Sequence, residues 1–188
     1  MNPRKRNIVI ATLTAAALAG GTVAAFAAGD DGTAAARSGV SVANVHGVTA
    51  AEAIAAALRH TPGTVVSAEL DDDGGDAGAW GVDVVADDGA EYAVEVSADG
   101  KVLGAQRDAE EGESDSEDLA ELEALKGAKF DARDAALVAA AKGAVTEVGG
   151  DDDENGAVVW GVETVKDGVT SEWAVTLDTG EITKVTAD

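Results

Sequence analysis

The chain has 188 residues, enough for one ordinary domain or two very small ones. Its 36 acidic and 13 basic residues give a formal net charge of −23, and a chain this acidic repels the phosphate backbone of nucleic acids. It has no cysteine, which excludes disulfides, thiolate metal sites and cysteine nucleophiles, and its two histidines leave little for histidine-based catalysis. The composition therefore predicts a small secreted protein that is not an enzyme.

The first residues have the features of a secretory signal peptide. Three basic residues at 4–6 precede an apolar run from Ile8 to about Ala28. Cleavage after Ala27 fits the small-x-small rule, so we predict a signal peptide over residues 1–27. A retained N-terminal membrane anchor is the alternative, because an apolar run of about 21 residues can span a bilayer. In the first case the rest of the chain is secreted or associated with the cell wall of a bacterium.

A segment without predicted structure and a capped helix come next. Residues 28–44 are mostly Ala, Gly, Val and polar residues, and we expect them to be disordered. Thr49 and Glu52 have the spacing of a capping box, in which each side chain accepts a hydrogen bond from the other's backbone N–H. The Ala-rich sequence that follows predicts a helix to about His60, ended by Pro62 and the glycine after it.

Short strands separated by Asp-Gly turns follow this helix. Trp80, Val82 and Val84 alternate with small or acidic residues, which predicts a strand with one buried face. Tyr92 begins a second alternating run. We expect these aromatic side chains, and those of the matching strands below, to lie in the core rather than to line a ligand groove. The strands predicted here cover residues 65–70, about 80–84, 92–96 and 101–105.

An acidic segment separates this first unit from a second one. Residues 109–124 begin with a run of carboxylates, which is typical of a solvated linker. Leu119, Leu122 and Leu125 then recur at every third position, and they predict a short helix that docks on one of the two units.

The second unit repeats the first about 80 residues later. Such an internal repeat has to be recognised before the fold can be predicted. Trp160-Gly-Val-Glu matches Trp80-Gly-Val-Asp, and Trp173-Ala-Val matches Tyr92-Ala-Val. A second helix is predicted from the cap Asp131 to about Lys142. Each unit therefore combines one helix with about four antiparallel strands.

The order of these motifs resembles the PepSY domain family, here as a tandem pair over residues 45–108 and 125–188. The resemblance implies an α+β fold of two small modules, each with one helix packed on a curved antiparallel sheet of about four strands. It also implies a place among secreted and membrane-bound bacterial proteins and among the propeptides that restrain thermolysin-like metallopeptidases. The family has no shared catalytic residues to carry over.

One acidic turn carries a candidate metal site. Asp151, Asp153 and Asn155, followed by Gly156, match the first half of a calcium loop, in which alternate oxygen ligands converge on the ion. The glutamate required at the twelfth position is replaced by Val162. The alternative interpretation is an acidic, solvent-exposed turn between two strands.

These observations predict a secreted, non-catalytic PepSY-domain protein that binds an extracellular protein partner, such as a peptidase that it restrains or another basic surface. An edge strand of the sheet could pair with an extended segment of that partner. The alternatives are a divalent-cation (calcium) binding protein and a structural protein of the cell envelope. No cofactor other than calcium is expected, nor a nucleic-acid partner.

Overall fold

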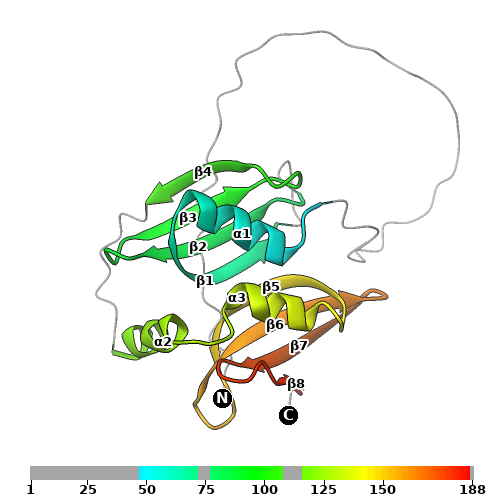
Figure 1. Cartoon of the computed structure of the whole chain (residues 1–188). Helices are drawn as coiled ribbons and strands as arrows, with labels where there is room; N and C mark the ends of the chain where they lie inside the picture. The colour runs from blue at the N-terminus through cyan, green and yellow to red at the C-terminus, as the bar shows by residue number, and fades with distance from the viewer. Residues whose placement is uncertain (1–46, 72–76, 108–115, 187–188) are drawn as a thin grey trace, which may run out of the picture. The chain divides into compact units, whose positions relative to one another are not determined.

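The computed structural model describes residues 47–71, 77–107 and 116–186. Over these residues the chain folds as an α+β protein, with three helices and one antiparallel sheet of eight strands (Figure 1). The predicted signal peptide, the segment 28–44 and the first part of the acidic linker lie outside the described residues. Within the described residues, no helix is long and apolar enough to cross a membrane.

The helices are α1 (Ala50–His60), α2 (Ser116–Lys126) and α3 (Ala132–Ala139). The strands are β1 (Gly63–Leu70), β2 (Trp80–Ala86), β3 (Glu91–Val96), β4 (Val102–Arg107), β5 (Ala144–Asp152), β6 (Val158–Lys166), β7 (Val169–Thr176) and β8 (Ile182–Lys184). Their order across the sheet is β4-β3-β2-β1-β5-β6-β7-β8, so β1 and β5 are neighbours at its centre. In each half of the chain, one helix (α1 or α3) is followed by four strands, which form one half of the sheet.

Helix α1 begins at the predicted capping box. The backbone N–H of Glu52 donates to Thr49 Oγ1 at 3.3 Å, and the N–H of Thr49 donates to Glu52 Oε2 at 2.9 Å. These two bonds satisfy amide groups that the first turn of a helix leaves without partners. The backbone hydrogen bond from Thr49 lowers the pKa of the Glu52 carboxyl, because it favours the ionised form.

Helix α3 begins as predicted but ends earlier. Asp131 caps it by accepting a hydrogen bond from the N–H of Asp134 at 2.9 Å, whereas its last residue is Ala139 and not Lys142. The reason lies at Gly143, where a Cβ atom would stand 2.8 Å from the carbonyl oxygen of Val165. The chain meets β6 at this point and must turn into β5.

One interaction ties the start of each helix to its half of the sheet. The indole N–H of Trp80 donates to the carbonyl of Val48 at 3.0 Å, and that of Trp160 donates to the carbonyl of Phe130 at 2.7 Å. Both carbonyls directly precede a helix cap, and both indoles are 1% exposed. Trp80 and Trp160 therefore have the same structural role, since each fills the core and fixes the start of its helix.

The eight strands form one continuous sheet. The sequence predicted two modules with a separate sheet each, and the structure does not confirm that prediction. β1 pairs with β5 over three residue pairs, Ser67 with Gly149, Ala68 with Val148, and Glu69 with Glu147. On one face of the sheet α1 lies over β1–β3 and α3 over β5 and β6, next to one another (Figure 1). The facing surfaces of both helices are mostly alanine, which lets backbones approach closely and form one shared core.

The short leucine-spaced helix is present as α2 and docks on the same face. Leu125 is buried among the core residues, whereas Leu119 is 53% exposed. The contact depends on Gly150 in β5, because a Cβ atom there would come within 3.0 Å of the Leu125 side chain. The second half of the predicted linker is therefore helix rather than extended chain.

Candidate functional site

The predicted calcium ligands lie in and beside the turn between β5 and β6. Asp153 Oδ1 accepts hydrogen bonds from the backbone N–H groups of Asn155 and Ala157, at 2.8 and 2.9 Å. These bonds hold the pKa of the Asp153 carboxyl below its usual value, since they favour the charged form. Asp151 lies on β5, where its Oδ1 accepts from the N–H of Asp152 at 2.8 Å.

Asp153 therefore has a clear local role, which is to fix the tight turn that Gly156 completes with a φ of 77°. Among the residues that the structure describes, there is no group of three or more His, Asp or Glu side chains arranged to hold a metal ion. A calcium site at Asp151, Asp153 and Asn155 stays a prediction.

The aromatic residues divide between core and periphery. Trp80 and Trp160 are fully buried, as the alternation predicted, while Tyr92 and Trp173 are half-buried at the edge of the core. The indole N–H of Trp173 donates to the hydroxyl of Thr164 at 2.8 Å, and the ammonium of Lys142 stands 5.1 Å from its ring centroid. This environment supports packing of the ring, with a cation on its face.

A row of glutamates crosses the sheet on the face opposite the helices. Glu69 in β1 pairs with Glu147 in β5, Glu147 pairs with Glu163 in β6, and Glu163 pairs with Glu172 in β7. The row extends in the other direction to Glu95 in β3, with Gly81 of β2 between. Directly opposed residues on neighbouring strands are only about 5 Å apart, so these like charges repel.

The pKa of Glu147 is raised at the centre of this glutamate row (Glu95, Glu69, Glu147, Glu163 and Glu172). Partial loss of hydration is the first cause of the raised pKa of Glu147, and the negative charges of its neighbours in the row and of Asp151 are the second. Sequence reasoning missed the row, because it joins strands from both halves. Its signal was the alternation that places Glu163 on the face opposite Trp160.

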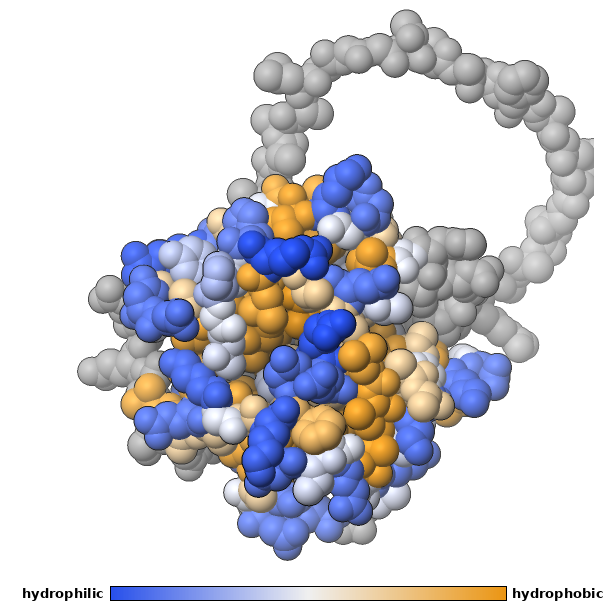
Figure 2. Space-filling view, viewed as in Figure 1, coloured by the Kyte–Doolittle hydropathy of each residue, from blue (hydrophilic) through white to orange (hydrophobic). Residues whose placement is uncertain are grey.

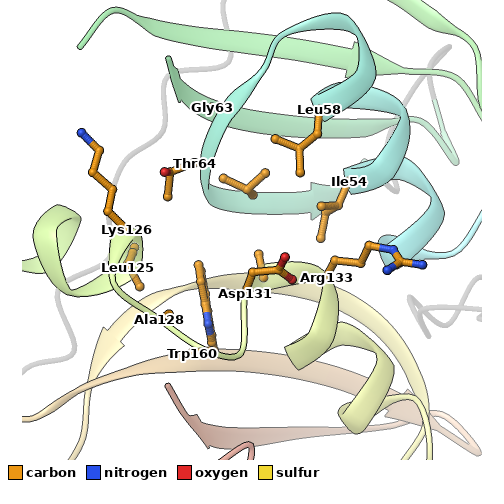
Figure 3. Close-up of a pocket in the computed structure, with 12 residues that line it drawn as sticks. Ile54, Leu58, Gly63, Thr64, Leu125, Lys126, Ala128, Asp131, Arg133 and Trp160 are labelled. Atoms are coloured by element: carbon orange, nitrogen blue, oxygen red, sulfur yellow. The ribbon is translucent and has the colours of Figure 1, made fainter. Parts of the chain in front are cut away.

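A small cavity of about 130 Å³ lies where the two helices and α2 meet (Figure 3). Its walls combine apolar side chains, among them Ile54 of α1, Leu125 of α2 and Trp160 of β6, with polar ones such as Thr64 and Asp131. A cavity of this size holds a group no larger than about a benzene ring.

The polar residues around this cavity do not converge on it. The charged ends of Lys126 and Arg133 point away from its centre on opposite sides (Figure 3). Asp131 is committed to capping α3. The cavity is therefore a packing gap between the two halves and supplies no set of polar groups aimed at one ligand.

β4 is one of the two edge strands of the described sheet. Among the residues that the structure describes, β4 pairs only with β3, and all the residues of β4 after Val102 are exposed. Leu103 forms a bulge between the paired residues on either side and is 59% exposed. On the helix-covered face, by contrast, hydrophobic surface is interrupted by hydrophilic residues (Figure 2). Edge strands with exposed backbone groups are ready templates for an added strand.

Comparison with known protein families gives one match, which covers the half of the sheet that contains β4. Residues 47–106 match the family model of the PepSY domain, described as "Peptidase propeptide and YPEB domain". This part of the chain is thus similar to the PepSY domain. The matched range runs from just before α1 almost to the end of β4, so it comprises one helix and four strands. Neither the curated proteins nor the solved structures give a significant match.

Proposed function

We propose that the protein is a secreted, non-catalytic PepSY-domain protein that binds an extracellular protein partner, and that this partner is a peptidase whose activity it restrains. The observation that carries the proposal is the PepSY match over residues 47–106, a family named for peptidase propeptides. The exposed edge of β4 in the same domain offers a surface for an extended polypeptide segment.

The second half is proposed to be a diverged second PepSY domain. Three features support a duplication: the same order of one helix and four strands, the matching indole bonds of Trp80 and Trp160, and the cap residues that follow their acceptors. The two copies share one sheet through β1 and β5, so they act as a single binding body rather than as two independent modules.

The charge of the chain favours a basic partner. A net charge of −23 gives long-range attraction to a positively charged surface and increases the rate of encounter, an effect that salt screens. The cation-binding alternative has less support, because Asp153 is engaged by its own turn.

The test is affinity capture with the full chain as bait and the secreted proteins of the producing cell as prey, at low and at high salt. The proposal expects one peptidase in stoichiometric amount, with recovery falling as salt rises. A bait in which the acidic surface is intact but the core is disrupted, Trp80→Ala, serves as the control for non-specific attraction. Recovery of the same proteins by both baits, or of no peptidase, contradicts the proposal.

A further inference from the structure

The two edge strands differ from the inner strands in charge. Each of the six inner strands carries at least one Asp or Glu, whereas β4 and β8 carry none. The only charged residue of β4 is Arg107, and that of β8 is Lys184. In a chain with a net charge of −23, the accessible edge of β4 is therefore free of the carboxylates that surround it.

The position of Gly104 gives this edge a further property. Gly104 pairs with Glu95, so it stands at the end of the glutamate row on the open face of the sheet. It has no side chain, and a Cβ atom built there would meet nothing within 4 Å. The carboxylate of Glu95 can thus be approached across Gly104 from beyond the edge.

A strand added beside β4 would place one residue opposite Gly104, on the same face as Glu95. That residue would lie two strand spacings from Glu95, or about 10 Å. A lysine or arginine and a glutamate together span this distance in extended conformations. The residues on either side of it would face the helix-covered side, one next to Ala105 and the other at the bulge that Leu103 forms beside Val102.

From this arrangement we propose that β4 binds, by strand addition, an extended segment of a protein partner that carries a lysine or arginine opposite Gly104. The backbone groups of β4 supply the hydrogen bonds, and Glu95 selects the basic residue. This proposal rests on the proposed function only in taking the partner to be a protein, and it adds the chemistry of the segment that binds.

The choice of a partner segment over a second copy of the chain follows from charge. Pairing β4 with β4 of another copy would bring together two chains of −23 each and would place no basic side chain opposite Gly104 in either. The long-range repulsion opposes that dimer, whereas it becomes attraction for a basic segment.

The experiment is an NMR titration of the full chain with short blocked peptides that alternate threonine and valine around a central residue. The central residue is lysine in one peptide and glutamate in the other. The proposal expects the lysine peptide to shift amide signals of β4 and β3 in a saturable way, and the glutamate peptide to bind more weakly.

Two matched variants separate the role of Glu95 from general attraction. Glu95→Gln is expected to weaken binding of the lysine peptide by about two- to fivefold, the range of an exposed ion pair, while Glu172→Gln at the far end of the row leaves it unchanged. Shifts outside β3 and β4, equal binding of both peptides, or equal effects of the two variants would overturn the proposal. So would concentration-dependent shifts of β4 amides without peptide, which indicate self-pairing.

These outcomes are independent of the capture experiment. Peptide binding at β4 without any captured peptidase would leave this inference standing and refute the proposed function. Capture of a peptidase that leaves the β4 amide signals unshifted would do the reverse.

Discussion

Glu69 of β1 lies directly opposite Glu147 of β5, across the short strand pair that joins the two halves of the sheet. The joint is thus made where two like charges face one another, with Glu163 of β6 next in the row. Three residue pairs hold this seam, and further contact between the halves comes from α1 and α3, which pack on one another, and from α2, which touches β1, β5 and β6. We therefore expect the stability of this seam to depend on the ionisation of its carboxylates.

Replacing Glu147 should stabilise the protein at neutral pH. Because the pKa of Glu147 is raised in the folded state, its ionised form disfavours folding. Glu147→Gln is therefore expected to increase the free energy of unfolding by about 0.5 kcal/mol at about pH 7. The gain should disappear as the pH falls below about 4, where the carboxyl is protonated in both states.

Urea denaturation at several pH values measures this difference. Glu91→Gln is the matched control, since Glu91 is an exposed strand glutamate on the same face but opposite Val85 rather than another acid. An equal gain for both variants, or a gain at Glu147 that persists in acid, would show that net charge and not the row determines the effect.

Two glycines with positive φ should differ in what they tolerate. Gly180 has a φ of 66°, and a Cβ atom there would overlap the ring of Phe130, whereas Gly168 has a φ of 75° and open space around it. Gly168→Ala is expected to cost about 1 kcal/mol from backbone strain alone, and Gly180→Ala at least about 2 kcal/mol. Chemical denaturation of both variants checks the order. Equal losses of stability would mean that the Phe130 ring moves aside without a free-energy cost.

The cap of α1 should contribute measurably to stability. Thr49→Ala removes the hydroxyl that accepts from the N–H of Glu52 and is expected to cost about 1 kcal/mol. Thr49→Ser keeps the hydroxyl and should retain most of the stability. A serine variant as unstable as the alanine variant would assign the loss to the methyl group instead of the cap.

The predicted calcium site has a direct test in thermal unfolding. If Asp151, Asp153 and Asn155 hold calcium, the Tm should rise more in calcium chloride than in sodium chloride of equal ionic strength. Asp153→Asn should abolish that difference. Equal melting temperatures in the two salts would leave Asp153 with the role that its hydrogen bonds show, which is to fix the turn.

Local features of the fold could be predicted from the sequence because they depend on neighbours in the chain. Thr49 and Glu52 are three residues apart, so their capping box is visible in the sequence and is present in the structure. The alternation around Trp80 and Trp160 likewise placed both rings in the core. Cap spacing and two-residue periodicity are both local signals.

The features that the sequence did not reveal depend on pairing between distant strands. Nothing local indicates that Ala68 pairs with Val148, so the single sheet and the glutamate row across it could not be predicted. The early end of α3 has the same origin, since it is set by the close approach of Gly143 to Val165. The role proposed for Gly104 likewise depends on its pairing with Glu95, which the sequence alone does not show.

Restraint of a peptidase by this protein is tested by an activity titration of the captured peptidase with the full chain. We expect the activity to fall in proportion to added chain until it reaches a minimum near one equivalent, and we expect high salt to weaken the inhibition. Peptidase activity that stays constant at a large excess of chain, or chain that is degraded while activity continues, would contradict the claim that this protein restrains its partner.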